Sequence, residues 1–203
     1  MNILKLHTMK NSIKKNSFFI LTLVIMVTVF LNSCDQMSES IIDKSIGTNG
    51  SFEHAKNGLP VNWFLYTPKT VQTGSFDIIT DTTEFKDGKQ SLKFLVRECS
   101  AMGGRLSPGF FQEFHETKPG ETYKVSFWIK NRGSEFIVKI YGVSDMKGED
   151  GHVLKSKETF DTWRLFEYLY TIPPKVWIRF EMNILQPGSF WIDDIKIERV
   201  KNN

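Results

Sequence analysis

The sequence predicts an all-β fold, an antiparallel β-sandwich or barrel. Short runs of β-branched and aromatic residues recur from Asn49 to Val200, and turn residues separate them. Several of these runs alternate apolar and polar residues with a period of two, which is the pattern of a half-buried strand. No helical period of useful length lies between them. Regularly spaced short strands without helices are typical of sandwiches and barrels.

The first 33 residues do not belong to this fold. Lysines precede an apolar run from Phe18 to Leu31, and small residues follow it. This order is typical of a secretory signal, and the run is shorter than the roughly 20 residues that a membrane-spanning helix needs. The segment Leu31-Asn-Ser-Cys34 resembles a bacterial lipobox, in which the cysteine receives lipid. Residues 1–33 are therefore predicted to be a lipoprotein signal peptide, and Cys34 the lipidation site.

The signal also accounts for the apparent basicity of the chain. Its removal leaves 22 basic against 23 acidic residues, a net charge of −1. Nothing then predicts a nucleic-acid partner, which requires a basic stripe. The protein is expected to be secreted across the inner membrane and anchored by lipid in the bacterial cell envelope, at the outer membrane or cell surface. Residues 34–48 are polar without periodicity after Cys34, and we interpret them as a flexible tether.

Residues 49–203 form one domain of a size that buries a single core. The expected strands are Trp63–Tyr66, Ser75–Thr80, Ser91–Cys99, Phe110–His115, Thr122–Lys130, Phe136–Val143, Thr162–Thr171, Lys175–Leu185 and Ser189–Val200. In the last of these, uninterrupted alternation groups Asp193 with three apolar side chains on one face. A carboxylate in such a place costs free energy unless it is satisfied. Asp193 is thus expected either to accept several backbone N–H bonds or to bind a cation.

Five segments together resemble carbohydrate-binding modules of family 4/9, which belong to the galactose-binding-like jelly-roll superfamily. They are Asn49-Gly-Ser-Phe-Glu53, Gly58-Leu-Pro-Val-Asn-Trp63, Asp87-Gly-Lys-Gln-Ser-Leu-Lys-Phe94, Pro119-Gly-Glu-Thr-Tyr-Lys-Val-Ser-Phe-Trp-Ile-Lys130 and Phe190-Trp-Ile-Asp-Asp-Ile-Lys-Ile-Glu198. The resemblance covers about Asn49 to Val200 and implies a jelly-roll sandwich. It also implies a structural Ca²⁺ that joins the first strand to the last.

The resemblance carries the calcium ligands onto Glu53 and Asp193, with backbone carbonyls from Asp87–Ser91. Asp194 is the alternative ligand if the strand register differs by one residue. Carboxylate and carbonyl oxygens are the ligands that Ca²⁺ takes in proteins. The neighbouring pair Asp193 and Asp194 is not expected to act as acid and base, because adjacent strand residues point to opposite faces.

The candidate ligand site consists of aromatic and polar side chains on strand faces that point away from the core. Saccharides present apolar C–H faces and hydroxyl edges, which suit aromatic platforms beside a few placed polar groups. The predicted ligand residues are Trp128, Tyr141, Trp177, Arg179, Glu181, Asn183 and Gln112. Loop aromatics in Trp63–Tyr66 and Gly109–Phe111 offer a rival location at one end of the sandwich, and the sequence does not choose between them.

The expected function is non-catalytic glycan binding by a lipid-anchored envelope protein, with a poly- or oligosaccharide as partner. The common motifs of serine hydrolases, zinc proteases and phosphate-binding loops are absent from the sequence. The alternative is a structural or protein–protein interaction module that keeps the sandwich without binding sugar. A panel of glycans separates the two hypotheses.

Overall fold

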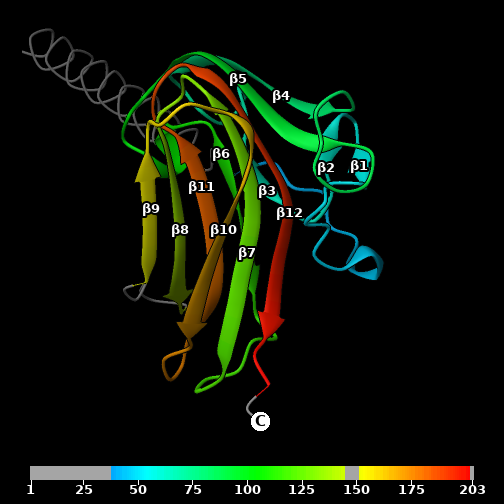
Figure 1. Cartoon of the computed structure of the whole chain (residues 1–203), viewed down its shortest axis with the longest axis vertical. Helices are drawn as coiled ribbons and strands as arrows, with labels where there is room; N and C mark the ends of the chain where they lie inside the picture. Colours follow the sequence, from blue (N-terminus) through cyan, green and yellow to red (C-terminus); the bar gives the residue numbers. More distant parts are fainter. Residues whose placement is uncertain (1–37, 145–150, 202–203) are drawn as a thin grey trace, which may run out of the picture. The chain divides into compact units, whose positions relative to one another are not determined.

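The protein is described by a computed structural model that covers residues 38–144 and 151–201. Two five-stranded antiparallel sheets form a β-sandwich (Figure 1). Sheet I has the order β10-β7-β12-β5-β4, and sheet II has the order β3-β6-β11-β8-β9. The predicted signal peptide and Cys34 lie outside the described residues. Within the described ranges, no helix has the length and apolar character that crossing a membrane requires.

Sheet I contains β4 (Gly74–Asp81), β5 (Ser91–Cys99), β7 (Thr122–Arg132), β10 (Phe160–Thr171) and β12 (Gly188–Arg199). Sheet II contains β3 (Phe64–Tyr66), β6 (Gly109–Phe114), β8 (Phe136–Val143), β9 (His152–Ser156) and β11 (Trp177–Ile184). A small ribbon pairs β1 (Ala55–Lys56) with β2 (Leu59–Pro60), and two 3-10 turns are η1 (Lys44–Ile46) and η2 (Gly104–Leu106).

The predicted fold class is confirmed, and every strand expected from the sequence is present with its ends shifted by at most two residues. Strand β9 is not among the strands expected from the sequence. It is the edge strand of sheet II and, among the described strands, pairs only with β8. It is short, and its side chains are partly or fully exposed, so it lacks the apolar alternation that marks a buried strand.

Aromatic side chains join the two sheets in the core. Trp63 and Phe110 have ring centroids 5.0 Å apart, and both rings contact Phe180 of β11. Across the sandwich, Phe127 of β7 meets Phe180 edge to face at 5.3 Å. Trp63 is fully buried, and its indole N–H donates to the carbonyl of Asn49 at 3.0 Å. The turn tryptophan therefore fixes the first part of the domain to the core.

A β-bulge in β12 corrects the face assignment made for the last strand. The register of β12 against β7 shifts between Asp193 and Lys196, and Asp194 has a positive φ of 52°. Such a bulge inserts a residue and reverses the alternation beyond it. Asp193 is therefore aligned with Trp128 on the outer side of sheet I, whereas Ile195 returns to the core. Uninterrupted alternation was the wrong assumption for this strand.

Residues 38–47, which the sequence analysis assigns to the tether, are held against the domain. Glu39 pairs with Leu65 of β3 through two backbone hydrogen bonds of 2.9 and 2.7 Å. The side chain of Asn62 accepts from the N–H of Asp43 and donates to the carbonyls of Asp43 and Gly47. Hydrogen bonds thus connect Glu39, Asp43 and Gly47 to the sandwich, and the boundary of the tether at residue 48 stays a prediction.

Candidate functional site

The outer face of sheet II is the side of its strands that points away from the core. Strand β11 places Trp177, Arg179, Glu181 and Asn183 on this face, as its alternation predicts, while its other face is fully buried. β11 lies between β6 and β8, so side chains of three neighbouring strands meet around it. This arrangement makes β11 the axis of the candidate site.

The strand register decides which side chains meet. Arg179 is aligned with Glu113 of β6 on one side and with Tyr141 of β8 on the other. Glu181, two residues further along β11, is aligned with Phe111 of β6. Directly opposite residues in an antiparallel pair have Cβ atoms about 5 Å apart, so charged and aromatic groups are brought into contact across the sheet.

A network of charged hydrogen bonds occupies the middle of this face. The Glu181 carboxylate accepts from the hydroxyls of Tyr66, at 3.0 Å, and Tyr141, at 2.7 Å. The Arg179 guanidinium lies 3.4 Å from Glu181 and donates to Glu113 at 3.1 Å. Glu181 is only 5% exposed although it lies on the outer side of the sheet. Buried charges of this kind must be paired, and here each one is.

Aromatic rings surround the network. Phe64 and Phe111 stack with centroids 4.9 Å apart and planes 11° from parallel. The Arg179 guanidinium lies 3.8 Å from the centre of the Phe111 ring, in cation–π contact. Trp177 donates its indole N–H to Glu113 at 3.0 Å. Phe64, Phe111 and Trp177 all remain partly exposed, so the face offers apolar surfaces with fixed orientations.

Burial changes the acid–base behaviour of the two tyrosines. Desolvation and the negative charge of Glu181 raise the pKa of both Tyr66 and Tyr141 well above its ordinary value. Both hydroxyls therefore keep their protons at neutral pH and stay hydrogen-bond donors to Glu181. The polar part of the face is thus a preformed, rigid set of groups.

The face includes four residues that the sequence analysis did not select, and they are Phe64, Tyr66, Phe111 and Glu113. It treated the aromatics among them as a rival location in loops at the end of the sandwich. The structure places them on strands beside β11, so the two locations are parts of one face. The alternation of Phe110–His115 could have placed Phe111 and Glu113 on this face, because Phe110 is fully buried and every second residue after it points inward.

Two predicted ligand residues do not reach the surface of this face, because Asn183 is covered and Gln112 points inward. Asn183 is fully buried, donates to the carbonyl of Gly104 at 2.9 Å and accepts from the N–H of the same residue, which holds η2 against β11. Gln112 is aligned with Phe180 and so lies on the core-facing side of β6. Its Oε1 is buried without a hydrogen-bond partner in the described part of the chain. Neither residue presents its polar atoms on the outer face of sheet II.

Trp128 belongs to the opposite sheet. It lies on β7, on the outer face of sheet I, next to Leu165 of β10 in the strand register. The ammonium group of Lys86 lies 4.1 Å from the centre of its ring. The sequence analysis grouped Trp128 with Trp177 because both point away from the core. It could not show that the two strands are in different sheets.

The predicted calcium ligands Glu53 and Asp193 both bind the turn that precedes β5. Asp193 is fully buried, and its carboxylate accepts the N–H groups of Lys86 at 2.7 Å and Asp87 at 3.0 Å, and that of Asp194 at 2.7 Å. Glu53 accepts two further N–H groups of the same turn, at 2.8 and 3.0 Å. Asp193 therefore accepts several backbone N–H bonds, which is the first of the two arrangements expected from the sequence.

These surroundings do not fit a calcium site as they stand. Backbone N–H groups cannot coordinate a cation, and in the described residues no three His, Cys, Asp or Glu side chains gather where they could hold one. Asp194 pairs with Lys196 at 2.7 Å. Calcium binding by Glu53, Asp193 or Asp194 stays a prediction, and it requires the turn to direct carbonyl oxygens toward the carboxylates.

A thermal melt tests calcium at this place. If the cation binds, adding a chelator lowers the melting temperature of the wild-type protein and has much less effect on Asp193→Ala, because that variant lacks a ligand. A wild-type melting temperature that does not change on chelation assigns the stabilisation of the turn to its N–H bonds alone.

Comparisons with known proteins identify the fold. No protein-family model and no curated protein matches the sequence. Similar solved structures include the xylan-binding CBM22-1 domain of Paenibacillus barcinonensis Xyn10C, with 15% identity over 76% of this chain and 94% of that chain and a TM-score of 0.52. A CBM4 module has 16% identity, covers 75% of this chain and 98% of that chain, and has a TM-score of 0.51.

A further similar structure is the enzymatically active domain of tailspike protein 4 from bacteriophage CBA120, with 18% identity over 75% of this chain and a TM-score of 0.57. The chain spans only 21% of that protein. At these identities the similarity shows a shared fold. The chain therefore has the jelly-roll β-sandwich of the CBM22 and CBM4 carbohydrate-binding modules.

Proposed function

We propose that this protein is a non-catalytic glycan-binding protein of the bacterial cell envelope, and that it binds its ligand on the outer face of sheet II. The observation that carries the proposal is the rigid network of Arg179, Glu181 and Glu113 set among partly exposed rings. Charges buried on the outer face of a sheet lower stability unless they are paired, and here Arg179 pairs with Glu181 and Glu113. This pairing does not by itself require the partly exposed aromatic rings around it, and ligand binding gives those rings a role.

The chemistry of the face suits a saccharide. Trp177, Phe64 and Phe111 offer apolar surfaces for the C–H faces of sugar rings, and the adjacent guanidinium and carboxylates offer donors and acceptors for hydroxyls. The fold shared with xylan-binding and other carbohydrate-binding modules supports the same function. Which glycan is bound does not follow from fold.

The carboxylates of the face are poorly placed for hydrolysis. A glycosidase needs one carboxyl group that can donate a proton and a second that acts as base or nucleophile. Glu181 is already engaged by two tyrosine hydroxyls and by Arg179. Glu113 accepts from Trp177 and Arg179. Because both carboxylates are already occupied by these donors within the protein, we infer that the face binds without cleaving.

Affinity electrophoresis in gels that contain plant, algal or host glycans tests the proposal. We expect at least one glycan to retard the wild-type protein and Trp177→Ala to weaken retention about tenfold or more, which corresponds to about 1.4 kcal/mol. The loss follows from removal of an aromatic platform that makes one hydrogen bond within the protein.

Leu169→Ala is the matched control, because Leu169 is 61% exposed on β10 of the opposite sheet. It should be retarded as the wild-type protein is. Failure of every glycan to retard the wild-type protein would contradict the proposal and favour a protein–protein interaction module. Release of reducing ends from the panel would contradict the inference that the face is non-catalytic.

The anchor is proposed from the lipobox-like sequence at Cys34. Because the hydrogen bonds to the sandwich begin near Glu39, few residues separate the lipidated cysteine from the domain. Residues 35–38, fully extended, would span at most about 14 Å. The domain would then be held close to the membrane surface, much closer than a long flexible tether would allow.

Metabolic labelling with a fatty acid tests this anchor. Wild-type protein should incorporate the label, and Cys34→Ser should not, because the serine hydroxyl cannot replace the thiol that receives the diacylglycerol. Fractionation of the same cells should move the variant from the membrane to the soluble fraction. Equal labelling of both proteins would rule out Cys34 as the site.

A further inference from the structure

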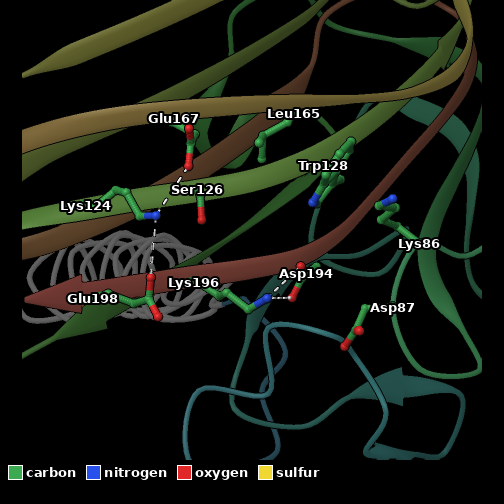
Figure 2. Close-up of a pocket in the computed structure, with 10 residues that line it drawn as sticks. All are labelled: Lys86, Asp87, Lys124, Ser126, Trp128, Leu165, Glu167, Asp194, Lys196 and Glu198. Carbon is green, nitrogen blue, oxygen red and sulfur yellow. Dashed lines mark hydrogen bonds and ion pairs between the residues drawn. The ribbon is translucent and has the colours of Figure 1, made fainter.

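The outer face of sheet I carries a pocket that the proposed function does not use. It lies over β10, β7 and β12 beside the turn that precedes β5, and it has a volume of about 580 Å³ (Figure 2). Its floor is formed by Ser126 and Trp128 of β7 together with Leu165 of β10. β7 is hydrogen-bonded to strands on both sides, which fixes the backbone from which Ser126 and Trp128 project.

Two polar groups on the floor have no partner within the described part of the protein. They are the indole N–H of Trp128 and the hydroxyl of Ser126, although Ser126 is only 6% exposed. Lys86 covers one side of the Trp128 ring at 4.1 Å. In Figure 2 the nitrogen-bearing edge of that ring faces the space between Ser126 and Asp194. The pocket therefore presents a donor and a hydroxyl to whatever enters it.

The walls of the pocket consist of lysines and carboxylates. Lys124 lies between Glu167, at 3.4 Å, and Glu198, at 3.8 Å, and Lys196 pairs with Asp194 at 2.7 Å. These contacts are drawn in Figure 2. Lys124, Glu167 and Glu198 lie on the protein surface, where such pairs contribute little to stability, whereas the Asp194 side chain is only 14% exposed. The surface pairs are also easily shared with a ligand, because their partners are held only weakly.

The charge of the lining nearly cancels, with the ammonium groups of Lys86, Lys124 and Lys196 against the carboxylates of Asp87, Glu167, Asp194 and Glu198. An ionic ligand would therefore gain little from the pocket as a whole. A ligand with many hydroxyls gains more, because each hydroxyl can accept from an ammonium group and donate to a carboxylate. An aromatic ring on the floor beside such a rim is the combination that a sugar ring needs.

We propose that this pocket is a second saccharide-binding site, for a neutral sugar unit, separate from the face on sheet II. The inference rests on the proposed glycan-binding function and extends it to the opposite sheet. Trp128 and Ser126 bind the ring from below, and the lysine–carboxylate pairs bind its hydroxyls. A protein with one site on each sheet can hold two glycan chains, or two segments of one chain, at the same time.

NMR of the tryptophan indoles tests the proposal on the ¹⁵N-labelled mature protein. The Trp128 indole reports on this pocket, and the Trp177 indole reports on sheet II, where it bonds to Glu113. The indole of Trp191, which is buried and bonds to Asp81, is the internal reference. The probes are neutral xylo-, gluco- and manno-oligosaccharides, with oligouronates in a second arm, and Trp→Phe variants assign the signals.

We expect a neutral oligosaccharide to shift the Trp128 signal saturably, in the wild-type protein and in Trp177→Ala alike, and Ser126→Ala to weaken this response about threefold or more. A Trp177 signal that shifts while that of Trp128 stays in place would overturn the second site and leave the proposed function standing. A Trp128 shift that disappears in Trp177→Ala would also contradict a separate second site. Tighter binding of oligouronates than of neutral oligosaccharides would contradict the assignment of a neutral sugar as the ligand. If neither signal shifts with any probe, both proposals fail.

Discussion

Replacing Glu181 with leucine should lower the free energy of unfolding by about 3 kcal/mol, measured by urea denaturation at pH 7. The carboxylate is nearly fully buried and holds Arg179, Tyr66 and Tyr141. Its removal leaves the buried hydroxyl of Tyr66 and the partly buried hydroxyl of Tyr141 without an acceptor, and it leaves the guanidinium with one carboxylate in place of two. Removing one partner of a buried pair costs more than the pair itself contributes, because the other partner stays desolvated.

A half-exposed pair supplies the matched control. Arg97 and Asp77 are 2.7 Å apart, with side chains 51% and 50% exposed, and they also lie on the outer face of a sheet. Asp77→Ala should lower the free energy of unfolding far less than Glu181→Leu does, because water replaces the lost contact. If Glu181→Leu costs as little as Asp77→Ala, the network on sheet II is a surface feature, and the argument for a rigid site loses its basis.

Glu181→Gln separates the charge from the hydrogen bonds. The carboxamide oxygen can still accept from a tyrosine, but the negative charge that helps to raise the pKa of Tyr66 and Tyr141 is removed. Spectrophotometric titration at alkaline pH should therefore show both tyrosines ionising at lower pH than in the wild-type protein. Desolvation still acts on them, so their pKa values should stay above that of a free tyrosine.

The fold could be predicted from the sequence because its strands carry a strong local signal. In β11, for example, the inward face is apolar without exception, and the outward face reads as one aromatic followed by polar residues. Ring contacts such as that between Phe127 and Phe180 then join the inward faces of the two sheets. The edge strand β9 shows the limit, because a half-exposed strand has no apolar face to recognise.

The candidate site could be predicted only in part, because alternation gives the face of a strand and not its sheet. Trp177, Arg179 and Glu181 share one strand, so they could be grouped correctly. Trp128 satisfied the same rule, yet β7 lies in the other sheet. The bulge at Asp194 was likewise invisible, because one residue with positive φ reverses the alternation and leaves no compositional mark.

Stability should also depend on pH through Asp193. Burial raises the pKa of this carboxyl group to about 6, although three backbone N–H groups oppose the change. The ordinary value is 3.8, so between these two values the folded protein binds a proton that the unfolded chain does not. The stabilisation of the folded state by protonated Asp193 is fully present below pH 3.8 and is lost as the pH rises through about 6. The difference of about two pKa units corresponds to about 3 kcal/mol.

Asp193→Asn removes this dependence, because an amide does not titrate in this range. Measured by urea denaturation in a chelator, the stability of the wild-type protein relative to Asp193→Asn should fall by about 2 kcal/mol between pH 4 and pH 7. The change with pH is diagnostic, since any fixed cost of fitting the amide beside the N–H of Asp194 cancels. A relative stability that is constant over this range would contradict the prediction.

Asp81→Asn is the control for that measurement. Burial by itself would raise the pKa of Asp81, but hydrogen bonds from Thr83 and Trp191 hold this pKa well below its usual range. The ionised Asp81 carboxylate therefore stabilises the fold at every pH above the pKa of the unfolded chain, and this effect is lost only in more acidic solution. The stability of the wild-type protein relative to Asp81→Asn should thus stay nearly constant between pH 4.5 and 7.5.

Repeating the Asp193→Asn comparison in Ca²⁺ then shows whether Asp193 is ionised by a bound cation. A bound cation favours the ionised carboxylate and would abolish the loss of stability toward neutral pH.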